Sequence, residues 1–88
     1  MSWVVRLSRE ALKDHKNLPK DMWERVERAT EDMRADPFHG DVRAVTGKEW
    51  KGYYRKRVGP YRIIFTIDHK EHVAGVTAII RRSEKTYR

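Results

Sequence analysis

Two strand patterns joined by a tight turn restrict the fold of this 88-residue chain more than any other feature. The stretch YYRKRV, residues 53–58, leads through Gly59-Pro60, a strong turn signal, into YRIIFTID, residues 61–68. A third strand pattern, HVAGVTAIIRR, follows a short polar connection. The carboxyl-terminal half is therefore expected to form an antiparallel meander of three strands.

The amino-terminal half differs, because after one initial strand at residues 2–7 its apolar residues recur at helical spacing. Ser8 is the expected N-cap of a first helix that ends near Asn17. A second helix over residues 20–35 stops at an Asp-Pro pair, since a proline disfavours helical geometry in the residue before it. Its expected buried stripe consists of Met22, Val26, Ala29 and Met33.

The segment before the meander reads as a loop with one short strand around residues 42–45. The order of strand, two helices and a β meander, without a linker or repeat, predicts a single domain over residues 1–88. Its class is α+β, with two helices on one face of a mainly antiparallel sheet. Because the helices cover only one face, the other is expected to stay open to a ligand.

The net charge of +7 belongs entirely to the second half of the chain. Residues 1–47 hold nine basic and nine acidic residues, whereas residues 48–88 hold eleven basic and four acidic ones. This asymmetry indicates a polyanionic partner, which could be RNA, DNA or an acidic protein segment. The chain has no cysteine and no apolar run of membrane length, so we expect a cytoplasmic protein without disulfides or thiolate metal sites.

Period-two alternation brings three arginines together. In the stretch YRIIFTID, residues 61–68, Tyr61, Ile63, Phe65 and Ile67 share a face that is expected to belong to the core. Arg62 points the other way, and Arg55 and Arg57 share one face of the preceding strand, so all three would converge unless a bulge at Gly59-Pro60 shifts the register. One guanidinium group can donate two parallel hydrogen bonds to the oxygens of a phosphate. The three arginines therefore predict a phosphate-binding surface. The alternative is that solvated strand arginines only prevent aggregation of the sheet.

The stretch RKRVGPYRIIFTID, with the closing IIRRSEKTYR, resembles the RelE/ParE superfamily of toxins from type II toxin–antitoxin systems. The first strand and the helix LPKDMWERVERATEDMRADP are similar to that family as well, so the resemblance covers nearly the whole chain. It implies two helices against an antiparallel sheet, and a cognate antitoxin as partner. RelE-like members cleave mRNA in the ribosomal A site without a metal or other cofactor, whereas ParE-like members act on DNA gyrase.

The resemblance also implies roles for individual residues. Arg62 matches the arginine with which RelE-like enzymes hold the scissile phosphate, and Arg82 matches the arginine after the last strand, with Arg81 as the alternative. The implied catalytic set is Arg62, Arg82, Tyr87, Arg55 and Arg57. Further RNA contacts are expected from Lys51, Lys56, Arg81 and Arg88. Lys56 stands where relatives carry an apolar core residue, so its ammonium group must snorkel to water or the strand must be irregular.

Three functions remain open at this point. The first is a ribosome-dependent endoribonuclease, which we favour because the arginine and tyrosine positions are all filled. The second is an inhibitor of DNA gyrase, which would explain why no carboxylate or histidine lies within the motif. The third is a non-toxic basic binding module on the same fold. His69 and His72 lack a third ligand, so we expect them in a solvated hairpin turn and not at a metal site.

Overall fold

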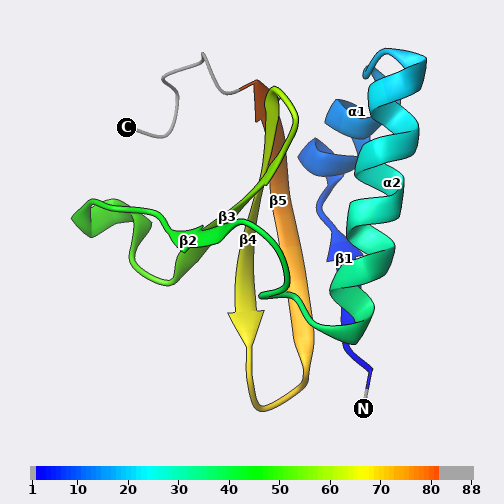
Figure 1. The fold of residues 1–88 in the computed structure, drawn as a ribbon. Helices are drawn as coiled ribbons and strands as arrows, with labels where there is room; N and C mark the ends of the chain where they lie inside the picture. Colours follow the sequence, from blue (N-terminus) through cyan, green and yellow to red (C-terminus); the bar gives the residue numbers. More distant parts are fainter. Residues whose placement is uncertain (1, 82–88) are drawn as a thin grey trace.

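A layer of two helices packs against one sheet in the computed structural model, which describes residues 2–81 (Figure 1). The elements follow one another as predicted, and the short strand expected around residues 42–45 is present as β2. The α+β class is therefore confirmed. The bounds are β1 Val4–Leu7, α1 Arg9–Lys16, α2 Lys20–Ala35, β2 Val42–Ala44, a 3-10 helix Lys48–Trp50, β3 Tyr53–Val58, β4 Tyr61–Asp68 and β5 Val73–Arg81.

The five strands form a single sheet in the order β1-β5-β4-β3-β2. Strands β2 to β5 pair antiparallel with their neighbours, as the meander predicted, whereas β1 runs parallel to β5. The two helices between β1 and β2 cover one face of this sheet (Figure 1). The opposite face is called the helix-free face below. Neither helix in residues 2–81 has the length and apolar character that a membrane crossing requires.

The core lies between α2 and the face of β4 that alternation assigned to it. Tyr61, Ile63 and Phe65 are buried there, and Ile67 packs beside them. The predicted helical stripe is confirmed, because Met22, Val26, Ala29 and Met33 are all buried. Burial of these side chains removes apolar surface from water and fixes which side of β4 faces the helices. The residues of β4 that alternate with these buried ones, including Arg62, therefore point to the helix-free face.

Polar side chains of α1 and of its N-cap form hydrogen bonds with both the helix and the sheet. The hydroxyl of Ser8 accepts a hydrogen bond from the Ala11 N–H at 3.0 Å, which confirms the predicted N-cap. The same hydroxyl donates to the carbonyl of Thr77 at 3.0 Å. A carboxylate oxygen of Asp14 accepts from the Ile79 N–H at 3.0 Å. Because β1 pairs with β5 only as far as Val76, α1 supplies hydrogen-bond partners to the next part of β5.

The turn between β3 and β4 preserves the strand register. Val58 pairs with Tyr61 directly across it, and Gly59 takes a φ of +56°, which glycine adopts without a steric penalty. The bulge considered at Gly59-Pro60 is therefore absent. The register shifts instead between β4 and β5.

This irregularity lies in β5. Ile64 and Phe65 of β4 stand opposite Ala78 and Val76, which leaves Thr77 without a partner residue on β4. The hydroxyl of Thr77 donates to the carbonyl of Ile64 at 3.3 Å. An extra residue of this kind turns the remainder of its strand over, because side chains alternate with period two.

Candidate nucleic-acid interface

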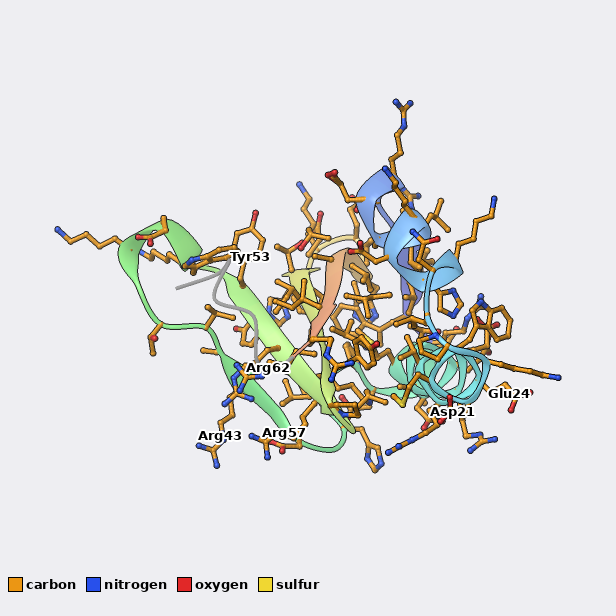
Figure 2. All side chains as sticks on the ribbon, turned by 90° about the horizontal axis from the view of Figure 1, so that it is seen from above. Asp21, Glu24, Arg43, Tyr53, Arg57 and Arg62 are labelled. Atoms are coloured by element: carbon orange, nitrogen blue, oxygen red, sulfur yellow. The ribbon has the colours of Figure 1, made fainter. Side chains whose placement is uncertain are left out.

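Arg55, Arg57 and Arg62 lie on the helix-free face, as alternation predicted. Arg57 stands directly opposite Arg62, and Arg55 stands opposite Ile64, which points away from the helices. Residues paired directly across an antiparallel ladder project to the same side. Figure 2 shows Arg57 and Arg62 on the side of the sheet away from α2. The hairpin register therefore brings these three side chains together.

A fourth arginine, which the sequence did not single out, belongs to the same face. Arg43 of β2 stands directly opposite Arg55 of β3, and Figure 2 shows it beside Arg57 and Arg62. Strand β2 has only three residues, so its alternation is too short to assign a face from sequence. Its pairing with β3 supplies that information. The four residues Arg43, Arg55, Arg57 and Arg62 are called the arginine face below.

The arginine face brings like charges together. Arg43 with Arg55 and Arg57 with Arg62 form two like-charged pairs across strands, an arrangement that destabilises a sheet. One carboxylate offsets part of this, since Nε of Arg57 lies 3.7 Å from Oδ2 of Asp41. Nη1 of Arg55 is buried, and no group within residues 2–81 accepts a hydrogen bond from it. A buried N–H without an acceptor is costly, so an oxyanion bound here would be stabilised.

Lys56 does not belong to this face, so the expectation that it contacts RNA is corrected. Its register points it toward the helices, where only 6% of the residue is exposed. Its Nζ donates to the carbonyl of His39 at 3.1 Å on the helix side, so a backbone carbonyl satisfies the ammonium group in place of the expected snorkelling to water. Burial lowers the pKa of Lys56 below the usual 10.5, and the carboxylates of Asp32 and Asp36 partly oppose that decrease.

The remaining predicted residues lie elsewhere. Lys51 is exposed in the loop before β3. Arg81 pairs with Tyr61, a core residue, and its guanidinium carbon lies 5.6 Å from the centre of the Tyr61 ring, a distance typical of a cation–π contact. The structure thus places Arg81 apart from the arginine face, and its expected RNA contact stays a prediction. Three other predicted residues lie outside the described residues: Arg82, Tyr87 and Arg88.

An aromatic side chain continues the row of arginines along β3. Tyr53 pairs with Thr66 and shares the face of Arg55 and Arg57 by alternation. Its ring meets that of Trp50 edge-on, with the ring centres 5.2 Å apart. Cationic groups with a neighbouring aromatic ring form the usual binding surface for single-stranded nucleic acid.

The two histidines of the H-x-x-H pattern lie around the turn between β4 and β5, as expected. The ring of His72 stacks on Trp3 with centres 4.3 Å apart, and His69 meets Trp3 edge-on at 6.2 Å. Within residues 2–81 no group of three or more His, Cys, Asp or Glu side chains is arranged to hold a metal ion. The rings of both histidines pack with Trp3 in an aromatic cluster.

Comparison with known proteins agrees with this architecture. The family model of the ParE toxin of type II toxin–antitoxin systems, parDE, matches residues 5–86. Among curated proteins none matches significantly.

Solved structures of toxins share the fold. The toxin of an archaeal RelE–RelB complex from Pyrococcus horikoshii is similar with a TM-score of 0.81 and 23% identity, over 97% of this chain and 100% of that one. A RelBE toxin–antitoxin complex from Mycobacterium tuberculosis gives 0.82 and 20%, over 93% and 100%. The Escherichia coli RelBE complex gives 0.73 and 15%, over 94% and 100%. With the family model matching nearly its full length, the chain belongs to the ParE toxin family of type II toxin–antitoxin systems, within the RelE/ParE superfamily.

Proposed function

We propose that this toxin is a ribosome-dependent endoribonuclease that cleaves mRNA without a metal ion. The observation that supports this proposal is the arginine face, on which four arginine side chains project from three neighbouring strands to the same side of the sheet. Asp41 lies in ion-pairing distance of Arg57, and no other carboxylate within residues 2–81 lies that close to Arg43, Arg55 or Arg57. A surface of this kind is suited to hold a phosphodiester and to neutralise the charge that develops on it.

The proposed reaction is attack by an RNA 2'-hydroxyl on the adjacent phosphorus. The bond from phosphorus to the 5'-oxygen breaks, the 2'-hydroxyl loses its proton, and the departing oxygen gains one. The products are a cyclic phosphate and a free 5'-hydroxyl. Arginine keeps its proton near neutral pH, so the arginines contribute orientation and charge stabilisation and do not transfer protons.

The proposal assigns roles as follows. Arg62 and Arg82 hold the phosphate, and Arg55 or Arg57 orients the 2'-hydroxyl by hydrogen bonding. Tyr87 stacks on a base or orients it. We assign the arginine after the last strand to Arg82 because Arg81 is engaged with the Tyr61 ring.

Mapping of mRNA ends in a translating extract tests this function. The wild-type toxin should produce cuts in phase with codons. The double variant R62A/R82A should lower cleavage at least about 100-fold, since it removes two groups that stabilise the transition state. R28A is the matched control, because Arg28 is exposed on α2 and away from the arginine face. Wild-type cleavage by the double variant would disprove the assigned roles.

The family model favours a second candidate, inhibition of DNA gyrase, because the matching family is that of the ParE toxins. If induced expression leaves mRNA intact and causes gyrase-dependent DNA damage, the ribonuclease proposal is wrong and gyrase inhibition is the function. Absence of both effects would favour the third possibility, a non-toxic basic binding module on this fold.

We also propose that a cognate antitoxin neutralises the toxin in the cytoplasm. The solved complexes from Pyrococcus, Mycobacterium and Escherichia pair a similar chain with an antitoxin, which supports this. An acidic antitoxin segment would complement the arginine face. Co-expression of the adjacent gene should abolish toxicity and allow the two proteins to be purified together.

A further inference from the structure

We propose that Arg43 and Arg55 form a second phosphate site beside the one at Arg57 and Arg62. The helix-free face then holds two consecutive phosphates of one RNA strand, which crosses β4, β3 and β2 obliquely. This inference rests on the proposed function in taking RNA as the ligand. It concerns binding alone, so it can be tested without cleavage.

The strand register sets the spacing of the two sites. Arg57 faces Arg62 between β3 and β4, and Arg55 faces Arg43 between β2 and β3. The centres of the two pairs therefore differ by one strand across the sheet and two residues along it. Strands lie about 4.8 Å apart and advance about 3.3 Å per residue, so the centres are about 8 Å apart. The length of an arginine side chain lets both pairs reach neighbouring phosphates of an extended strand.

The second site differs from the first in its charge balance. Arg57 is partly neutralised by Asp41 at 3.7 Å. Within residues 2–81, neither Arg43 nor Arg55 has a carboxylate in ion-pairing distance. Nη1 of Arg55 is also buried without an acceptor in that range. A phosphate between these two guanidinium groups would relieve their repulsion and accept the unused hydrogen bonds.

Tyr53 favours single-stranded RNA over an acidic protein segment as the occupant. It lies two residues before Arg55 in β3 and on the same face, where it is half-buried and its ring contacts the Trp50 ring. A base that follows the second phosphate can stack on this ring. A carboxylate side chain cannot stack on the ring as a base does.

Fluorescence anisotropy with a labelled oligouridylate, over a range of salt concentrations, tests the proposal. R43Q should weaken binding about tenfold and reduce the slope of log affinity against log salt by about 0.7, the value for one phosphate contact on a single strand. R43K should keep the slope but bind more weakly, because lysine cannot make the bidentate contact. R28Q changes the net charge equally on exposed α2 and should leave both quantities unchanged.

Two results would overturn the proposal. One is an unchanged affinity and slope for R43Q, or an equal loss for R28Q, which would indicate attraction by net charge alone. The other is that R43Q weakens the binding of a hexaglutamate peptide but leaves RNA binding unchanged. That result would identify an acidic protein segment as the occupant. Loss of RNA binding in R43Q would support the second site even if the wild-type toxin cuts no mRNA, so the two proposals can fail separately.

Discussion

Lys56 places an ammonium group where the strand pattern calls for an apolar core residue. Burial is the main cause that lowers its pKa below 10.5, and Asp32 and Asp36 oppose this in part. Between the lowered pKa and the usual one, the native state binds fewer protons than the unfolded chain. The free energy of unfolding should therefore rise as the pH increases through that window, and below it the cost of the buried charge is fully present.

Replacement of Lys56 by methionine tests this account. K56M removes the buried charge and keeps a side chain of similar length, so we expect it to be as stable as the wild type at pH 7, or more stable by about 1 kcal/mol. Its free energy of unfolding should not rise as the pH approaches 10.5, the usual lysine pKa. Urea denaturation at a series of pH values measures both effects, with exposed Lys51→Met as the control. A marked loss at pH 7, with the alkaline rise retained, would contradict it.

The arginines show how far single residues could be placed from the sequence. Arg55, Arg57 and Arg62 were predictable because a two-residue turn fixes the register of their hairpin. Arg43 was not, since a three-residue strand carries too little alternation and its pairing depends on a long connection to β3. The catalytic residues that the family resemblance implied lie in β3, in β4 and at the carboxyl terminus, and none of them lies in β2.

Strand β5 explains why Arg81 lies apart from the arginine face. Strict alternation from Val73, which lies on the helix-free face opposite Asp68, would assign Arg81 to that face as well. The extra residue Thr77 turns the remainder of β5 over, so Arg81 stands against Tyr61 on the helix side. The hydroxyl of Ser8, far from this strand in the sequence, donates to the carbonyl of the extra residue Thr77. A local sequence pattern therefore could not reveal it.

The α1–β5 contact leads to a prediction at the level of these two elements. D14A leaves the Ile79 N–H without its acceptor and should lower the free energy of unfolding by about 1–3 kcal/mol. D14N keeps an acceptor oxygen and should lose less. Chemical denaturation gives both values, and hydrogen exchange should show faster exchange of the Ile79 amide in D14A than in D14N. Equal losses in the two variants would mean that the carboxylate charge, and not the hydrogen bond, stabilises this contact.

Across the whole molecule, the positive charge that is concentrated in the second half of the sequence is also concentrated on one side of the fold. The surplus of +7 lies in residues 48–88, and part of it projects from β3 and β4 opposite the helices. Asp21 and Glu24 of α2 lie on the far side of the molecule from Arg43, Arg57 and Arg62 (Figure 2). Charge counting predicted a polyanionic partner. The sheet register was needed to show where that partner would bind.

A binding face made of like charges should reduce stability when the ligand is absent. R43Q removes one cross-strand repulsion, so at low salt it should raise the free energy of unfolding by about 0.2–1 kcal/mol. Near 1 M salt the screening length falls to about 3 Å, and the gain should vanish. Thermal unfolding at both salt concentrations measures this, with R28Q as the control of equal charge change. A gain that persists at high salt would indicate a packing effect. A gain confined to low salt, in a variant that also binds RNA more weakly, would mean that Arg43 is retained for binding at a cost in stability.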